Sequence, residues 1–294
     1  MERPHILLIG KNGQVGWELR RALAPMARLT AVDFPEIDLT DADAARKLVL
    51  DTRPALVLNA AAYTAVDKAE SDAETARLIN AVAPGALAET AREIGAWIVH
   101  FSTDYVFDGA KRQPYVETDA PNPLGVYGRT KLEGDRAVQA ANARHLIFRL
   151  CWVYGTRGQN FLLTIQRLAR ERETLRVVQD QFGCPTWSRL IAEAVALALR
   201  QVLANGGDAA RFAGTYHLAA SGYTNWHTFA SRIVELMPES ERRCRQVQAI
   251  STAEYPTPAR RPAWSVLDCG TLKRVFGLEL PDWEAGLRLA LDQP

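Results

Sequence analysis

Residues 5–25 read "HILLIGKNGQVGWELRRALAP", and this stretch decides the fold class. Its first part, "HILLIG", is a short apolar run that ends in glycine, as buried β-strands do. The second part predicts a helix, because Val15, Leu19 and Leu23 recur at the spacing of one helix face and Pro25 stops the pattern. The stretch therefore predicts a strand, a tight glycine turn and a helix in direct succession.

The same alternation of strand and helix continues through the first half of the chain. Apolar strand patterns at 28–33, 55–61, 97–103 and 145–155 are separated by helix patterns at 41–54, 72–95 and 127–142. The helix at 72–95 should bend near Pro84 and Gly85. Strands that are apolar throughout are typical of a parallel sheet with helices on both faces. We expect an α/β fold with a Rossmann-type, doubly wound parallel sheet in residues 1–154, a dinucleotide-binding domain.

The second half of the chain has a less regular pattern. Helix patterns at 161–173, 188–207 and 226–238 flank a strand pattern at 215–221, and the proline-rich stretch 251–268 predicts a long loop. We expect residues 155–294 to form mainly a smaller C-terminal α/β substrate-binding domain. Segments near 188–221 should return to the first domain.

The glycine turn after the first strand predicts a phosphate-binding loop. Three glycines stand at the mouth of the first helix, where backbone N–H groups can contact a pyrophosphate: Gly10, Gly13 and Gly16. Their G-x-x-G-x-x-G spacing differs from the G-x-G-x-x-G fingerprint, so a merely flexible turn is the alternative. Asp33 ends the second strand and suits an adenosine ribose, which favours NAD, whereas Lys11 and Arg28 could tolerate the 2′-phosphate of NADP.

Polar and aromatic side chains follow the third, fourth and fifth strands, at the edge where doubly wound sheets bind ligands. The fourth strand ends in four polar residues, Ser102, Thr103, Asp104 and Tyr105, more than a turn or helix cap explains. The third ends in "NAAAYT" (59–64), whose alanines permit close approach of a flat cofactor, with plain packing as the alternative. The fifth brings Trp152 and Tyr154 to this edge, although core packing is an equal alternative for Tyr154.

Tyr127 and Lys131 stand four residues apart in the helix after the fourth strand, so they share one helix face. A free tyrosine has a pKa near ~10. A neighbouring ammonium and a cationic nicotinamide should lower that pKa, and Thr103 can hydrogen-bond the same oxygen. An isolated Tyr-x-x-x-Lys is more often a solvated pair, but behind a glycine loop it predicts a proton-transfer site.

Together these motifs resemble the extended short-chain dehydrogenase/reductase family almost from end to end. Tyr-x-x-x-Lys marks the large family, whereas "STDYVFDG" and "PTPARRP" mark the group that reduces the C4 ketone of dTDP-4-dehydro-L-rhamnose to dTDP-L-rhamnose. The resemblance implies a cytoplasmic oxidoreductase that uses NADPH or NADH to make a nucleotide sugar for O-antigen or lipopolysaccharide. Another nucleotide-sugar reductase or epimerase, or a non-catalytic regulatory subunit of the methionine adenosyltransferase type, is the alternative.

The resemblance also implies roles for individual residues. Tyr127 would donate a proton to the ketone, Lys131 would bind the nicotinamide ribose and tune Tyr127, and Thr103 would polarise the ketone. The implied cofactor contacts are Gly10, Asn12, Gly13, Gln14, Val15, Gly16, Asp33, Asp38, Leu39, Ala62, Tyr63, Thr64, Tyr127 and Lys131, with Asp38 and Leu39 beside the adenine. The expected substrate contacts are Thr103, Asp104, Tyr105, Trp152, Arg260 and Arg261. The two arginines are the candidates for the diphosphate, with a salt bridge to the protein body as the alternative.

The composition of the chain limits which binding partners are expected. A net charge of +1 points to neither nucleic acid nor an anionic membrane, and the apolar runs are too short to cross a bilayer. The four cysteines and five histidines lack metal-ligand spacing, so we expect free thiols and no metal. A homodimer is possible, but Arg189 stands where some relatives carry a glutamate that holds a bridging magnesium ion, which argues against a metal-bridged dimer.

Overall fold

The structure of the protein, a computed structural model, describes residues 3–292 and is built around one parallel sheet. Six strands pair in the order β10-β5-β4-β3-β1-β2, with every pairing parallel. They are β1 (His5–Ile9), β2 (Arg28–Val32), β3 (Leu56–Asn59), β4 (Trp97–Thr103), β5 (His145–Leu150) and β10 (Gly214–His217). The predicted doubly wound parallel sheet is confirmed.

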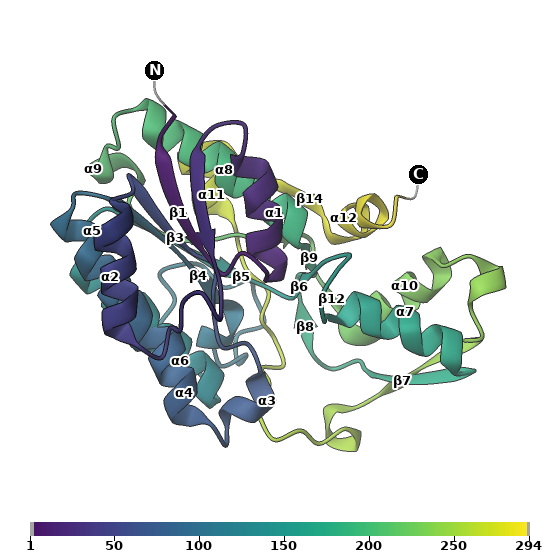
Figure 1. The fold of residues 1–294 in the computed structure, drawn as a ribbon. Helices are drawn as coiled ribbons and strands as arrows, with labels where there is room; N and C mark the ends of the chain where they lie inside the picture. The colour runs from purple at the N-terminus through teal and green to yellow at the C-terminus, as the bar shows by residue number, and fades with distance from the viewer. Residues whose placement is uncertain (1–2, 293–294) are drawn as a thin grey trace.

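Helices cover both faces of this sheet (Figure 1). One face carries α2 (Ala42–Thr52), α5 (Ala83–Glu93) and α6 (Val126–Ala141), and the other carries α1 (Gln14–Leu23), α8 (Ser188–Ala204) and α11 (Gly270–Phe276). Side chains of β1 alternate between the two cores: Leu7 and Ile9 belong to the first, and Ile6 and Leu8 to the second. Because both faces are covered, the strand must be apolar at every position.

The predicted helix at 72–95 is distorted before the expected bend. The structure has α4 (Ala73–Arg77), a π-helical turn at Leu78–Val82 and then α5. Pro84 has no N–H to donate to Asn80, so the helix widens just before the proline. The Asn80 side chain bonds the backbone of Tyr63 at the end of the third-strand segment, with N···O distances of 2.9 and 3.1 Å.

The predicted strand at 145–155 is wrong in its second half. It breaks at Trp152, whose φ of 43° lies in the left-handed region, and β6 (Val153–Tyr154) leaves the sheet to pair with β9 (Thr186–Trp187). The predicted strand at 215–221 likewise splits into β10 and β11 (Ala220–Ser221), and β11 pairs with β14 (Leu280–Asp282).

The rest of the second half lies beside the main sheet in Figure 1. Its strands are β7 (Thr174–Val178), paired with β13 (Gln246–Ile250), and β8 (Phe182–Gly183), paired with β12 (Thr224–Asn225). Its main helices are α7 (Phe161–Glu171), α10 (Trp226–Leu236) and α12 (Trp283–Ala290), which share an apolar core. Short helices complete the chain: α3 (Val66–Ala69), α9 (Ala209–Phe212) and the 3₁₀ turns Asp104–Val106, Glu239–Glu241 and Thr252–Glu254. The boundary between the two expected domains stays a prediction.

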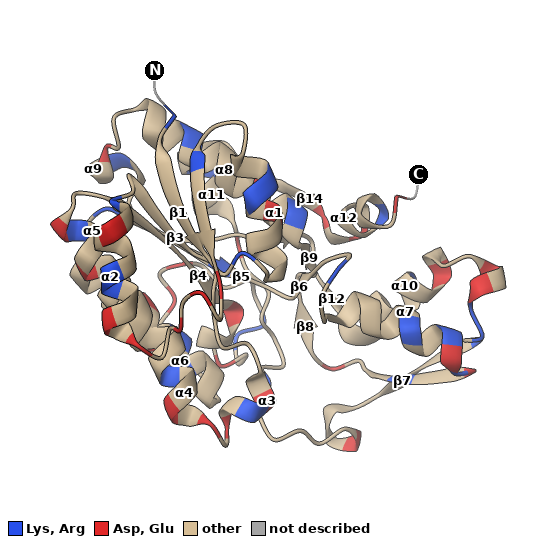
Figure 2. Cartoon of the chain, viewed as in Figure 1, with Lys and Arg blue, Asp and Glu red and all other residues tan. Residues whose placement is uncertain are grey.

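Charge is spread over the outside of the molecule. In Figure 2, basic and acidic residues alternate along the outer helices, and the central strands are uncharged over most of their length. Within residues 3–292, no helix has the length and apolar character needed to span a membrane.

Candidate active site

The carboxyl ends of β1, β3, β4 and β5 border a cavity of about 600 Å³. Residues expected to bind cofactor or substrate line this cavity: Gly10, Asn12, Gly13, Gln14, Val15, Asp33, Ala62, Thr64, Thr103, Asp104, Tyr105, Tyr127, Lys131 and Trp152. Motifs far apart in the sequence therefore meet at one edge of the sheet, as the parallel topology requires.

The glycine loop forms one end of the cavity and has the features of an anion site. Gly10 has a φ of 89°, and a Cβ there would lie 2.7 Å from the carbonyl carbon of Ala60. Helix α1 starts after Gly13 with no side-chain cap, so its first N–H groups are available to a ligand. Gly16 is buried away from the cavity, where its lack of a side chain lets α1 pass the Gly10 carbonyl.

Asp33 is held rigidly beside this loop. Its carboxylate accepts hydrogen bonds from the backbone N–H groups of Asn12 and Phe34, both at 2.8 Å. Lys11 donates to Glu36 at 2.7 Å and is therefore partly neutralised. Arg28 starts β2, at the strand end opposite Asp33, so it does not face the cavity. Of the two cations expected to tolerate a 2′-phosphate, only Lys11 lies in the loop beside Asp33.

Tyr127 lies in the first turn of α6. The Glu70 carboxylate accepts the N–H of Val126 at 2.8 Å and fixes the start of this helix, while the Tyr127 ring meets Tyr105 edge-on at 5.7 Å. Desolvation and the charges of Asp104 and Asp135 raise the pKa of Tyr127 to about 12, although a hydrogen bond with Thr103 acts in the opposite direction. The phenol is therefore protonated at neutral pH and can act as a proton donor.

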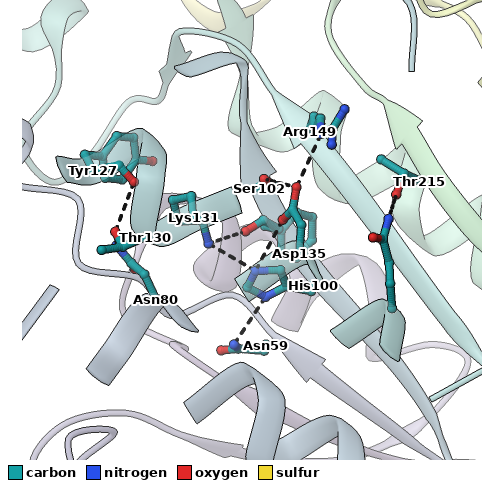
Figure 3. Close-up of polar contacts among 12 residues, drawn as sticks. Asn59, Asn80, His100, Ser102, Tyr127, Thr130, Lys131, Asp135, Arg149 and Thr215 are labelled. Atoms are coloured by element: carbon teal, nitrogen blue, oxygen red, sulfur yellow. Dashed lines mark hydrogen bonds and ion pairs between the residues drawn. The ribbon is translucent and has the colours of Figure 1, made fainter. Parts of the chain in front are cut away.

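Lys131 follows Tyr127 on α6 and points toward His100 of β4 (Figure 3). Its Nζ donates to the carbonyl of Phe101 at 2.6 Å and lies 3.2 Å from Nε2 of His100. Burial lowers the pKa of Lys131 to about 8, and the negative charge of Asp135 limits that fall. In the protein alone, desolvation is the largest influence on the pKa of Tyr127. The lowering expected from Lys131 together with a cationic nicotinamide stays a prediction.

Thr103 and Asp104 form a hydrogen-bonded pair at the end of β4. The Thr103 hydroxyl donates to the Asp104 carboxylate at 3.0 Å and accepts from the N–H of Tyr105 at 3.2 Å. Burial raises the pKa of Asp104 to about 6, opposed by hydrogen bonds from Ser265, Cys151 and Thr103. The carboxyl group is thus a buried acid that titrates close to neutrality.

Comparison with known proteins identifies the family. The family model described as "RmlD substrate binding domain" matches residues 4–294. The chain belongs to this family. It is 48% identical to dTDP-4-dehydrorhamnose reductase of Escherichia coli (strain K12), with 98% of this chain and 97% of the relative aligned.

Two solved structures of reductases with the same name support the assignment to the RmlD family. The structure from Clostridium acetobutylicum has a TM-score of 0.89 and 37% identity, and covers 98% of each chain. The structure from Bacillus anthracis, in complex with NADP, has a TM-score of 0.89 and 31% identity, and covers 99% of each chain. The fold and the family inferred from the sequence motifs are therefore confirmed.

Within this member of the RmlD family, several expected contacts lie outside the cavity lining. Asp38 accepts hydrogen bonds from Thr40, Leu39 is buried in the core, and the Tyr63 hydroxyl donates to Asp72 at 2.9 Å. Arg261 forms an ion pair with Asp67 at 2.8 Å, which is the salt-bridge alternative, and Arg260 is exposed. The binding roles of Gly16, Asp38, Leu39, Tyr63, Arg260 and Arg261 stay predictions.

Other residues line the cavity without having been predicted. The main example is Trp226 of α10, whose ring stacks on Trp152 with a centroid distance of 3.6 Å and an angle of 9°. Gly158 and Gln159, from the loop after β6, also line it. These residues come from the irregular half of the chain and belong to no motif. Tyr154, in contrast, is only 1% exposed and packs in the second-half core, so core packing is the correct alternative there.

The cysteines and acidic residues within residues 3–292 have the side-chain chemistry of metal ligands. All four cysteines are free thiols. Among the residues that the structure describes, no group of three or more histidine, cysteine, aspartate and glutamate side chains could hold a metal ion. Arg189 bonds Glu193 at 2.9 Å, one turn along α8.

Proposed function

We propose that the protein reduces the C4 ketone of dTDP-4-dehydro-L-rhamnose with NADPH or NADH to give dTDP-L-rhamnose. One observation carries this proposal: a single cavity combines a glycine-loop anion site with Tyr127, Lys131 and Thr103. The chain that forms this cavity is 48% identical to a dTDP-4-dehydrorhamnose reductase. The class is an oxidoreductase acting on a ketone of a nucleotide sugar.

The cavity fits a nicotinamide dinucleotide. Uncapped N–H groups at the start of α1 suit a pyrophosphate, and the backbone at Gly10 leaves no room for a side chain. Asp33 and the residues Ala62 and Thr64 extend the same wall. When bound there, the cofactor supplies the hydride.

The protein's own groups handle the proton and the developing charge. Tyr127 donates its phenolic proton to the ketone oxygen, because its raised pKa keeps that proton on the phenol until charge develops on the substrate. Thr103, whose hydrogen bond opposes the raised pKa of Tyr127, orients that side chain. The positive charge of Lys131 stabilises the phenolate that forms on Tyr127. Trp152 forms a flat wall for the sugar.

The direct test follows the absorbance of NADPH, and separately NADH, with dTDP-4-dehydro-L-rhamnose. Wild-type protein should oxidise at least one cofactor, and Tyr127→Phe should lower kcat by about 100-fold or more, because the proton donor is lost. Cofactor affinity, measured by fluorescence, should change little. Full turnover of Tyr127→Phe would contradict the mechanism, and no oxidation by wild type would favour a non-catalytic binding role.

We also propose that the protein acts in the cytoplasm and forms a homodimer without a bridging metal. The free thiols support the cytoplasmic location, and the Arg189–Glu193 ion pair supports the absence of a bridging metal. Light scattering with and without a chelator tests the assembly, since a mass that falls on chelation would contradict a metal-free dimer.

A further inference from the structure

Lys131 belongs to a buried polar cluster that begins at the cavity and includes residues outside the cavity lining (Figure 3). The cluster brings together His100 and Ser102 of β4, Asp135 of α6 and Arg149 of β5. His100 is 0% exposed, Lys131 and Asp135 are 1% exposed, and Arg149 is 4% exposed. Burying charges at this depth costs stability unless they are paired, so the arrangement calls for a functional explanation.

Asp135 supplies the negative charge of this cluster. It lies one helical turn after Lys131, so the two side chains share a face of α6. Its Oδ2 accepts hydrogen bonds from Ser102 at 2.9 Å and from Arg149 at 3.3 Å. Its Oδ1 has no hydrogen-bond partner and lies 3.9 Å from Nε2 of His100. One carboxylate oxygen is thus anchored, while the other faces His100.

His100 stands between Asp135 and Lys131. Burial and the charge of Lys131 lower the pKa of His100 well below its usual value, so the ring is neutral. A charged Lys131 can only donate, so Nε2 of His100 accepts the hydrogen bond from Nζ at 3.2 Å and the single ring proton lies on Nδ1. Nδ1 lies 3.4 Å from the side-chain amide of Asn59. Nε2 faces both Lys131 Nζ and the unpaired oxygen of Asp135.

We propose that Asp135 and His100 are positioning residues for Lys131, in which Asp135 keeps the amine charged and His100 fixes the direction of Nζ. The inference rests on the proposed function, since the charge of Lys131 matters only if Tyr127 is the proton donor. The titratable groups beside Lys131 are His100 from β4 and Tyr127 and Asp135 from α6, and Arg149 from β5 pairs with Asp135. Asp135 is the one that favours the ammonium, and it opposes the burial that lowers the pKa of Lys131.

The charge of Lys131 can be measured without substrate or cofactor. Full-length protein labelled with ¹⁵N-lysine gives the titration midpoint of Nζ by NMR, and Lys131→Met assigns the signal. Asp135→Asn should lower the midpoint by about one unit, because an opposite charge at this range has been removed. Glu133→Gln is the matched control: it makes the same charge change on α6, but at an exposed residue that pairs with Arg77 at 2.8 Å. An unchanged midpoint in Asp135→Asn would overturn the proposal.

A second variant covers the risk that Asp135→Asn does not fold. That change leaves Arg149 buried without its counter-charge, whereas Asp135→Asn combined with Arg149→Met removes both charges. The double variant should also lower the Lys131 midpoint, and a midpoint equal to that of wild type would count against Asp135.

Enzyme kinetics distinguish the proposed role of Asp135, which keeps Lys131 charged, from that of His100, which orients it. In Asp135→Asn the alkaline limb of the pH profile of kcat/KM should move to lower pH with the NMR midpoint. His100→Gln should leave that limb in place and lower kcat roughly tenfold, because Nζ loses its direction but not its charge. A merely structural role would lower activity equally at every pH and would contradict the proposal. If wild type oxidised no NADPH while the midpoint still moved, the proposed function would fail and the positioning of Lys131 would stand.

Discussion

At the scale of single residues, the hydroxyl of Thr103 shows how a neighbour can direct a catalytic group. A threonine hydroxyl has one hydrogen, and Thr103 gives it to Asp104 at 3.0 Å. With Asp104 ionised, Thr103 therefore has no hydrogen left to donate to Tyr127 or to a ketone. Protonation of Asp104 releases that hydrogen. The charge of one buried carboxyl group therefore determines which group accepts the hydrogen bond from Thr103.

The buried charge of Asp104 should be visible in the stability of the protein. Burial raises its pKa from 3.8 to about 6, so the folded state binds more protons than the unfolded state between these values. The contribution of Asp104 to the free energy of unfolding is therefore largest below about pH 4 and falls by up to about 3 kcal/mol as the pH rises through 6. Urea unfolding measures this effect. The free energy of unfolding of wild type, relative to that of Asp104→Asn, should fall as the pH rises across this window.

Asp119→Asn is the control, because Lys111 holds the pKa of Asp119 below its usual value. Its stabilising contribution is present above the unfolded pKa and is lost as the pH falls, which is the opposite slope. A difference between wild type and Asp104→Asn that stays constant from pH 4 to 7 would contradict a buried, titrating Asp104.

At the scale of elements, three segments hold Trp152 as a flat plate at the cavity. The break between β5 and β6 turns the residue outward with a φ of 43°. Trp226, at the start of α10, stacks on one side of its ring, and Gly183 of β8 lies against the ring with no side chain between them. The orientation of this wall is therefore set by the second half of the chain.

Gly183→Ala should disturb this wall selectively. A Cβ at Gly183 would lie 2.7 Å from Nε1 of Trp152, closer than packing allows, so the indole must move. We expect the KM for the nucleotide sugar to rise roughly tenfold while the dissociation constant of NADPH stays the same. Gly286→Ala is the control, since its added Cβ meets Leu190 at an ordinary 3.5 Å. Equal loss of affinity for cofactor and sugar would show that the change is not local.

The elements also show what the sequence can and cannot predict. Strand β4 begins and ends where its apolar pattern does, and the glycine turn before α1 was evident from spacing alone. The break at Trp152 had no such signal, because "CWVYG" is apolar throughout and one left-handed residue leaves no trace in hydropathy. Trp226 was missed for another reason: it reaches the cavity through tertiary packing, which no local pattern records.

At the scale of the whole molecule, a loop near the C-terminus is tied to the N-terminal half beside the cavity. Arg261 forms an ion pair with Asp67 of α3 at 2.8 Å, and its guanidinium also bonds Thr257 and the carbonyl of Ala259. Its positive charge also acts on Tyr105, which lines the cavity, and opposes the rise in the pKa of that phenol. The observed contacts clamp this loop, and the predicted contact with the substrate diphosphate would be a second role for the same side chain.

Two substitutions distinguish these roles of Arg261. The Asp67 side chain is 41% exposed, so water screens the pair and its loss in Arg261→Ala or Asp67→Asn should lower the free energy of unfolding by only about 1 kcal/mol. If Arg261 only clamps the loop, both variants should change the KM for the nucleotide sugar alike. If it also binds the diphosphate, Arg261→Ala should raise that KM about tenfold or more, because a charge-assisted hydrogen bond is lost. Asp67→Asn, which leaves the guanidinium free to bind, should then keep the KM close to that of wild type, and matching kinetics in the two variants would exclude the diphosphate contact.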